Sequence, residues 1–233
     1  TRPGLAGSVP STVTVPADML TAELLFRAAS VEGDETITAS AGGESATATA
    51  TVSSAPLGGL VINEVDYDNP GSDSMEFVEL YNATRVALDL TDIVVVFVNG
   101  ADRTEYRRVL LSGSLEAGAF LVIGNESLTV PPGTTHIDLP TNGIQNGAPD
   151  GIAVFDLADS SLLDALSYEG ALDAATLVGG VTINLVEGTP TDAADSSSAV
   201  MSLIRSPDGA DTDDASTDWQ TTSTPTPGSA NAP

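Results

Sequence analysis

Short apolar runs separated by polar turns dominate the chain from residue 60 onward. Gly, Asn, Pro and Asp residues interrupt the apolar pattern so often that no long amphipathic helix fits between them. Runs of this length, bounded by turn-forming residues, predict β-strands, and many short strands predict a β-sandwich. The predicted strands are Leu60–Tyr67, Glu76–Asn82, Ile93–Asn99, Glu105–Leu110, Ala119–Gly124, Thr135–Asp138, Gly151–Asp156, Leu162–Tyr168 and Val200–Arg205.

One of these strands differs from the others in its pattern. Val94–Val98 is apolar at every position, which predicts a strand buried on both faces in the middle of a sheet. Gly170–Asp195 is less regular, and its Gly179-Gly180 pair predicts an extra hairpin followed by a long loop.

The first part of the chain has its own alternating pattern. Over Leu20–Ala28, apolar residues recur at every second position, which predicts a strand. A helix over Asp18–Ser30 is the alternative, because Ala, Glu, Leu and Arg are good helix formers. We favour the strand because Glu35–Ser40 and Ser45–Val52, on either side of Gly42-Gly43, form a hairpin pattern.

A stretch of small residues, Ser53–Gly59, separates the two parts and is typical of a linker. The sequence therefore predicts two domains, residues 1–55 and 56–233. The Pro-rich segment Thr224–Pro233 is expected to be an extended tail of the second domain.

Two distant segments of the second domain resemble the lamin-tail domain. Leu60–Tyr81, which reads LVINEVDYDNPGSDSMEFVELY, is similar to the opening strands of that family. Ser202–Asn231 is similar to its closing segment, with a Ser-Leu-x-Arg strand, an Asp-rich loop, a Trp and a Thr-Pro-Thr-Pro-Gly exit. The resemblance implies an all-β, immunoglobulin-like β-sandwich of the lamin-tail type, and a module that binds or tethers and does not catalyse.

The first domain resembles the second half of a bacterial immunoglobulin-like surface repeat. The similar residues are VPSTVTVPAD and ETITASAGGESATATATV, within residues 9–52. A complete domain of this kind has about 100 residues, so several strands lack a partner here. Such a partial immunoglobulin-like segment would expose an apolar face and an unpaired edge. The missing strands could lie upstream in a longer protein, come from another molecule, or be replaced by packing on the second domain.

Charge limits the partners that the chain can have. The formal net charge is −26, from 33 acidic residues and seven arginines, with no lysine. Such a surface repels phosphate backbones, so we expect no nucleic-acid binding. Solubility in high salt, cation binding and repulsion between crowded surface proteins each fit the charge. Because the chain has no cysteine, it forms neither disulfides nor thiolate metal sites.

The apolar runs also bear on location. Runs such as Ile93–Val98 are too short to cross a bilayer, so we expect no membrane insertion. Thr1–Pro10 lacks the apolar core of a signal peptide, so the chain is expected to be a mature or excised piece of a longer protein.

Two acidic loops are candidate calcium sites, since Ca²⁺ binds carboxylate, amide and carbonyl oxygens on flexible loops. The stronger candidate lies between the last predicted strand and Trp219, and the weaker one follows the first strand. Solvated loops whose Asp residues form turn hydrogen bonds are the alternative interpretation. The residues are Asp208, Asp211, Asp213, Asp214 and Asp218 in the first loop, and Asp66, Asp68 and Asp73 in the second.

Residues that could support catalysis are few. His136 is the only histidine, and the sequence has no G-x-S-x-G nucleophile turn. Glu64, Glu76 and Glu79 occupy positions where the resemblance places acidic strand residues. They are expected to cap strand ends or to pair with an arginine, either Arg85 or Arg205. The chain is therefore not expected to be an enzyme.

Two further motifs are open to a structural and a functional interpretation. Asn82-Ala83-Thr84 and Asn125-Glu126-Ser127 match the N-glycosylation pattern, which arises by chance in a chain rich in Thr and Ser. Trp219 is expected to anchor the last strand in the core; an exposed sugar-stacking platform is the alternative.

These observations predict a secreted or cell-surface protein with a structural or adhesive role. Its subunits could form a fibre by β-strand complementation with copies of the same chain or with other surface proteins. The alternative is an accessory domain that binds calcium or a glycan and tethers a secreted hydrolase to the cell envelope.

Overall fold

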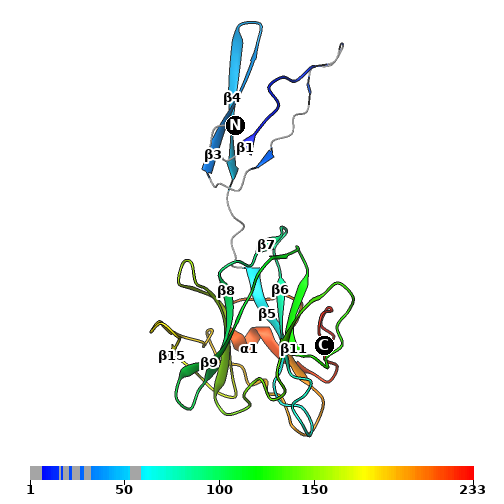
Figure 1. Ribbon diagram of the computed structural model, residues 1–233, viewed down its shortest axis with the longest axis vertical. Helices are drawn as coiled ribbons and strands as arrows, with labels where there is room; N and C mark the ends of the chain where they lie inside the picture. Colours follow the sequence, from blue (N-terminus) through cyan, green and yellow to red (C-terminus); the bar gives the residue numbers. More distant parts are fainter. Residues whose placement is uncertain (1–6, 16, 18–20, 23–26, 29–32, 53–58) are drawn as a thin grey trace. The chain divides into compact units, whose positions relative to one another are not determined.

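The computed structural model describes all residues except 1–6, 16, 18–20, 23–26, 29–32 and 53–58 (Figure 1). The chain divides into two compact units, residues 1–55 and 56–233. The predicted strand or helix around Leu20–Ala28 lies mostly outside the described residues, as does nearly all of the predicted linker Ser53–Gly59.

In the first unit, the main element is an antiparallel hairpin. β3 (Gly33–Ala41) pairs with β4 (Glu44–Val52) over their whole length. Gly42 and Gly43 connect them with φ angles of 63° and 91°, a left-handed conformation that glycine adopts without strain. The predicted hairpin is therefore confirmed. The short strands β1 (Gly7–Ser8) and β2 (Arg27–Ala28) pair antiparallel with each other.

The second unit contains two six-stranded sheets. The order of the first sheet is β12-β11-β6-β5-β17-β18, and all its strands are antiparallel except the β11–β12 pair. Its strands are β5 (Leu60–Asp66), β6 (Phe77–Asn82), β11 (Phe120–Asn125), β12 (Thr135–Leu139), β17 (Ser202–Arg205) and β18 (Trp219–Thr222).

The second sheet has the order β14-β13-β8-β9-β15-β16. β5 of the first sheet contacts β13 and β14 of the second, so the two sheets pack face to face as a sandwich. The strands are β8 (Ile93–Asn99), β9 (Thr104–Leu110), β13 (Asp150–Asp156), β14 (Ser161–Tyr168), β15 (Ala175–Thr176) and β16 (Thr182–Ile183). A separate pair is formed by β7 (Leu88–Asp89) and β10 (Ser114–Leu115).

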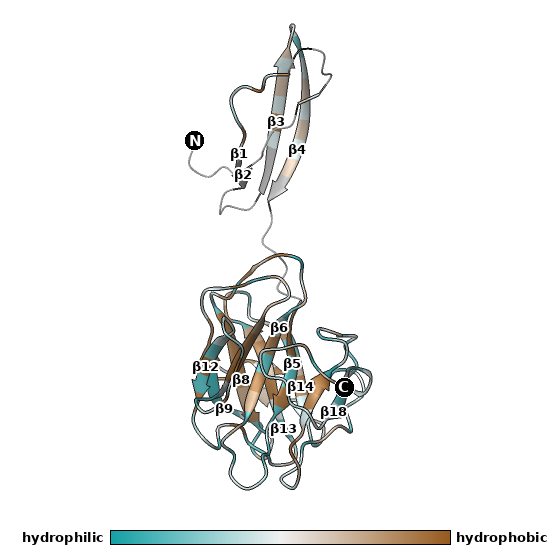
Figure 2. Ribbon diagram, turned by 90° about the vertical axis from the view of Figure 1, so that its right-hand side faces the viewer, coloured by the Kyte–Doolittle hydropathy of each residue, from teal (hydrophilic) through white to brown (hydrophobic). Residues whose placement is uncertain are grey.

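All nine strands predicted in this unit are present, with bounds that differ by at most two residues. Val94–Val98 is fully buried in β8, between β13 and β9, as its apolar pattern predicted. The hairpin predicted within Gly170–Asp195 is formed by β15 and β16. Figure 2 shows hydrophobic residues concentrated on the inner strands of this unit. The fold class, an immunoglobulin-like β-sandwich, is confirmed.

Helical structure is scarce in the described residues. α1 (Ala215–Asp218) is a single turn between β17 and β18. Among all the residues that the structure describes, no helix has the length and apolar character needed to span a bilayer.

Candidate functional site

The densest group of charges in the structure surrounds one buried arginine. Arg205 ends β17 and is completely buried. Its Nη2 donates to Asp164 Oδ1 at 2.9 Å and to Glu187 Oε2 at 3.4 Å. Its Nη1 donates to Asp218 Oδ2 at 3.1 Å and to Asp211 Oδ1 at 3.4 Å. Four acids thus share one guanidinium, whose planar fork offers five N–H donors.

This cluster also joins strands of both sheets. Nε of Arg205 donates to the Ile62 carbonyl on β5 at 2.9 Å, and the Ile62 nitrogen donates to Asp164 Oδ2 on β14 at 2.5 Å. The guanidinium carbon lies 4.9 Å from the ring centre of Trp219 on β18, a cation–π contact. The arginine therefore fixes β5, β14, β17 and β18 at one point.

Burial and charge oppose each other at these groups. Burial raises the pKa of Asp164 well above its ordinary value, while the charge of Arg205 lowers it. Burial lowers the pKa of Arg205, but the surrounding acids, Asp164 first, raise it above its usual range. The arginine is therefore always charged, and the acids around it compensate that charge.

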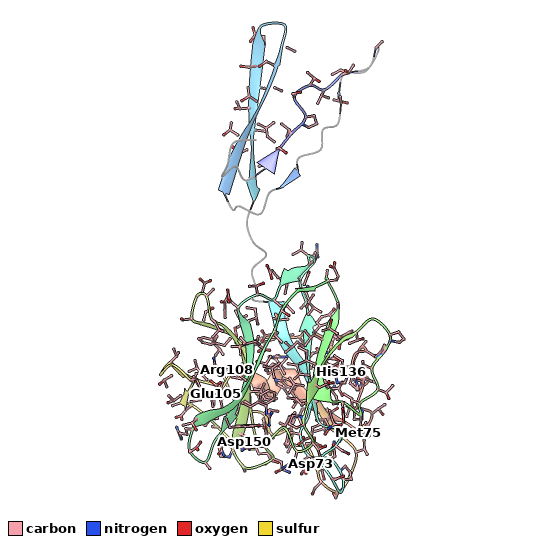
Figure 3. All side chains as sticks on the ribbon, viewed as in Figure 1. Asp73, Met75, Glu105, Arg108, His136 and Asp150 are labelled. Carbon is pink, nitrogen blue, oxygen red and sulfur yellow. The ribbon has the colours of Figure 1, made fainter. Side chains whose placement is uncertain are left out.

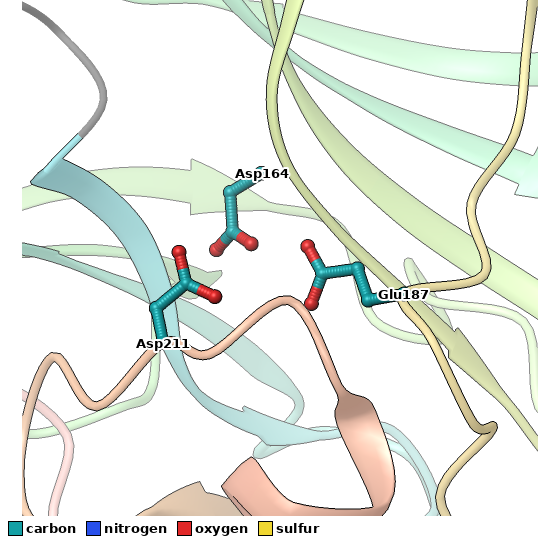
Figure 4. Close-up of side chains that lie close together, drawn as sticks. All are labelled: Asp164, Glu187 and Asp211. Carbon is teal, nitrogen blue, oxygen red and sulfur yellow. The ribbon is translucent and has the colours of Figure 1, made fainter.

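Three acids of this cluster are close enough to share a metal ion. Carboxylate oxygens of Asp164, Glu187 and Asp211 lie within 4.8 Å of one another, and Figure 4 shows them turned toward a common point. Each of the three also accepts a hydrogen bond from Arg205. The guanidinium therefore offsets part of their negative charge and ties the three acids to β17.

The stronger predicted calcium loop contributes to several different networks. Asp208 Oδ1 accepts from Asn63 Nδ2 and from the Asn231 nitrogen, both at 3.0 Å. It therefore connects β5 to the C-terminal segment. Among the five predicted ligands, only Asp211 belongs to the group of three acids described above.

The remaining residues of that loop form local hydrogen bonds. Asp214 is the N-cap of α1 and accepts from the Ser216 nitrogen at 3.2 Å. Asp213 has a left-handed backbone, and its nitrogen donates to Asp211. Asp218 accepts from Thr212 in addition to Arg205. Calcium binding by this loop stays a prediction.

The weaker predicted loop is organised around Asn69. Its Nδ2 donates to Asp66 Oδ1 at 2.6 Å, and its nitrogen donates to Asp73 Oδ1 at 3.0 Å. Asp68 accepts from Asn146 Nδ2 at 3.2 Å instead. Burial, followed by the neighbouring carboxyl of Asp195, raises the pKa of Asp66 far above its ordinary value. Calcium binding here also stays a prediction.

Glu64 and Glu79 hold the C-terminal segment against the first sheet. Glu64 accepts hydrogen bonds from Ser202 Oγ, from the Thr226 nitrogen and from Thr226 Oγ1. Glu79 accepts from Asn63 Nδ2 at 2.9 Å and from the Gly228 nitrogen at 2.6 Å. Of the two alternatives expected for these glutamates, pairing with Arg85 or Arg205 was wrong for Glu64 and Glu79, because amide and hydroxyl groups donate to them instead.

Glu76 is also without an arginine partner among the described side chains. Its Oε2 accepts from the Gly143 nitrogen at 2.6 Å and from the Ile144 nitrogen at 3.3 Å, and its Oε1 is buried without a partner. Burial raises the pKa of Glu76 to about 7 and that of Glu79 to about 8. Both carboxyls are therefore easier to protonate in the folded chain.

Both glycosylation patterns belong to asparagines with structural roles. Asn82 is fully buried, and its Nδ2 donates to the carbonyls of Val86, Leu115 and Glu116 at 2.8–3.0 Å. Asn125 is buried too, and its Nδ2 donates to a threonine hydroxyl. Neither amide nitrogen is presented to solvent in the folded chain.

His136 and Trp219 both contact neighbouring parts of the first sheet. Nε2 of His136 lies 3.3 Å from the Gly124 carbonyl on the neighbouring strand. Trp219 is 5% exposed and packs under Arg205, so the prediction that it anchors the last strand is confirmed.

Comparison with known families decides the relationship of this chain. The family model of the lamin tail domain matches residues 53–170, just over half of the chain. The chain belongs to the lamin tail domain family. No match was found among curated proteins. The matched lamin-tail range ends before β17 and β18, yet β17 pairs with β5 and completes the first sheet of the same sandwich. The preceding surface repeat has no such match and remains an expectation.

Sequence reasoning did not find the cluster around Arg205. The only local signal is a charged residue at the end of an apolar strand, SLIR, in which every residue is buried. Its acids come from β14, from the end of α1 and from two separate loop positions, so no spacing in the sequence reveals them.

Proposed function

We propose that this lamin-tail protein is a non-catalytic extracellular structural module whose subunits join by β-strand addition to the β3–β4 hairpin. Membership in the lamin tail domain family supports the non-catalytic part, since this immunoglobulin-like fold is typically a structural module. The buried charges around Arg205 also support it, because they tie β5, β14, β17 and β18 together.

The observation that carries the proposal is the hairpin itself. Within the described residues, β3 and β4 form a two-stranded sheet in which each strand pairs only with the other. Its side chains from Thr38 to Thr49 are exposed. Long unpaired edges are templates for an additional strand, and an isolated two-stranded hairpin is only marginally stable in water. A strand from a neighbouring subunit would satisfy the free backbone groups.

Association should be measured by light scattering of the full chain over a series of concentrations. We expect the mass to rise above 23.5 kDa with concentration at physiological ionic strength, where repulsion between charges is screened beyond about 8 Å. Lysines on an edge strand oppose strand addition. The double variant Thr36→Lys/Thr38→Lys should therefore remain monomeric.

A matched control separates strand addition from the change in charge. Ser112→Lys/Ala117→Lys adds the same charge at exposed positions of the second unit and should associate like the native chain. A constant monomeric mass of the native chain, or equal association of both variants, would reject strand addition at this hairpin.

The alternative function, a calcium- or glycan-binding accessory of a secreted hydrolase, has one supporting observation. The oxygens of Asp164, Glu187 and Asp211 converge, and each acid also pairs with Arg205, whose single charge offsets part of theirs. The same light-scattering series with calcium and with chelator tests this alternative, because association that requires calcium would favour it.

A further inference from the structure

A cleft of about 520 Å³ opens in the second unit, beside the loop that follows β5. Its volume lies within the usual range for ligand pockets. The lining comes from segments far apart in the sequence, including the C-terminal segment that Glu64 and Glu79 hold in place. Its apolar lining includes Met75, Phe77, Leu128, Val200, Pro225 and Pro227.

Two of these apolar side chains are exposed to solvent. Met75 is 42% exposed and Val200 is 59% exposed, and both line the cleft. Figure 3 labels Met75 beside Asp73, on the loop between β5 and β6. Large exposed apolar side chains that adjoin a concave surface are typical of a binding site.

An acid lies within this apolar lining. Asp66 is 4% exposed and lines the same cleft. Its Oδ1 accepts from Asn69 Nδ2, and the carboxyl of Asp195 shares a hydrogen bond with it. Asp195 in turn accepts from the nitrogens of Tyr67 and Asp68. Among the described side chains, no arginine forms an ion pair with either acid.

Asp66 in the cleft lining and Asp195 beside it are therefore buried together without a cation among the described side chains. Burying two charged acids in this way is unfavourable unless the pair holds a proton or a positive charge compensates it. This contrasts with the acids around Arg205, where the chain provides its own cation. Since the sequence contains no lysine, an ammonium group at the cleft would have to come from another molecule.

We propose that this cleft binds a lysine side chain of a partner protein, with the alkyl stem against Met75 and Val200 and the ammonium group on Asp66. A lysine matches both halves of the cleft, because its stem is apolar and its end carries a compact charge. The net charge of −26 favours the approach of a cationic partner. This inference does not depend on pairing at the hairpin.

Binding should depend on pH in a defined direction. Burial raises the pKa of Asp66, and the facing carboxyls of Asp195, Glu64 and Glu76 raise it further. At lower pH the pair therefore holds a proton, which an ammonium group must displace. Lysine binding should consequently strengthen between pH 6 and pH 9.

The methionine methyl groups report on this site directly. The chain has three methionines, and only Met75 lines the cleft; Met201 lies outside its lining and Met19 lies in the first unit. The full chain with ¹³C-methyl methionine should be titrated with the peptide acetyl-Leu-Lys-Leu-amide. We expect the Met75 signal to shift until it saturates and the Met19 and Met201 signals to stay unchanged. The norleucine peptide, in which norleucine replaces the lysine, should bind about ten-fold more weakly.

Two variants test the two halves of the cleft. Asp66→Asn removes the charge and should weaken lysine-peptide binding by about ten-fold without changing norleucine-peptide binding. Val200→Ser, at an exposed position where folding is little affected, should weaken both peptides. Asp68→Asn, which removes a neighbouring acid outside the buried pair, is the matched control and should bind like the native chain.

Three results would overturn the proposal. One is a Met75 signal that does not move with the lysine peptide at millimolar concentration. A second is equal binding of the norleucine peptide, which would make the cleft a purely apolar pocket. The third is a Met75 shift with calcium chloride but not with the peptide, which would assign the acids to a metal ion.

Discussion

Asp164 and Arg205 form an ion pair of 2.9 Å between the two sheets of the sandwich, and both side chains are completely buried. Asp164 belongs to β14 of the second sheet, and Arg205 ends β17 of the first. A pair of this kind contributes less through its own attraction than through the cost of separating it, because one partner alone would leave a buried charge uncompensated.

Arg205→Met should therefore destabilise the second unit severely. The substitution keeps an apolar side chain of similar length but leaves Asp164, Glu187 and Asp218 without their cation. We expect the free energy of unfolding to fall by about 3–5 kcal/mol. Urea unfolding followed by the fluorescence of Trp219, the only tryptophan, reports on this unit alone.

Arg103→Met is the matched control. Arg103 pairs with Asp173 at 2.6 Å, but their side chains are 53% and 71% exposed. An exposed ion pair contributes about 0–1 kcal/mol to stability, so the urea concentration at the midpoint of unfolding should hardly change. Equal effects of the two substitutions would show that burial does not determine the role of Arg205.

The lamin-tail unit should lose stability as pH rises from about 4.5 to about 8. Glu76 and Glu79 have ordinary pKa values of 4.5, which burial raises to about 7 and about 8 in the folded chain. Between these values the folded chain binds more protons than the unfolded chain, so the free energy of unfolding falls as pH rises. This contribution is complete below pH 4.5 and is lost through pH 7–8. Urea unfolding at pH 5, 7 and 9 measures the trend.

Asp66→Asn should make the fall in unfolding free energy with rising pH smaller. Burial raises the pKa of Asp66 as well, and an asparagine can donate to Asp195 as the protonated acid does. We expect stability like that of the native chain at pH 5 and a smaller decline by pH 9. Asp68→Asn, on the same loop but outside the pair, should keep the native slope. A native chain that becomes more stable between pH 5 and pH 9 would contradict both expectations.

Most of the fold could be predicted because strands and turns leave local patterns. The period of two, the turn residues and the apolar run of β8 were sufficient for nine strands and for the β3–β4 hairpin. β18 was missed because its sequence, WQTT, has no apolar alternation, and it becomes a strand only by pairing with β17. β7 and β10 are two-residue strands that also depend on distant partners.

The buried polar network could not be predicted for a similar reason. Among 33 acidic residues, sequence alone gives no basis for selecting the four that meet Arg205. Three of them lie 13 or more positions from it along the chain. Dense Asp spacing instead favoured the two loops as calcium sites, whereas the structure uses Asp214 as a helix cap and Asp208 to hold the C-terminal segment.

Thr226→Val should loosen the C-terminal segment. The hydroxyl of Thr226 donates to Glu64 Oε2 at 2.9 Å, and valine has the same shape but no donor. Loss of a hydrogen bond to a charged or partly charged group costs about 1.5–3 kcal/mol. Thr224→Val, an exposed neighbour on the same segment, should change stability by less than about 0.5 kcal/mol. Urea midpoints of the two variants decide whether Glu64 clamps this segment, and equal midpoints would reject the clamp.

Asn82→Asp should have one of the largest effects in the chain. The buried Nδ2 of Asn82 donates to three backbone carbonyls, and its Oδ1 accepts from the nitrogen and the hydroxyl of Thr84. An aspartate keeps the shape and both acceptor contacts, but it places a carboxylate against the three carbonyls. Each buried polar group left unsatisfied costs about 1–3 kcal/mol, so we expect a total loss of at least about 3 kcal/mol. Asn184→Asp is the matched control: Asn184 is exposed, and its Oδ1 accepts from the Val186 nitrogen, a contact that aspartate retains. Native-like unfolding of Asn82→Asp would show that the three carbonyls find other donors, and the strand β6 would then not depend on this side chain.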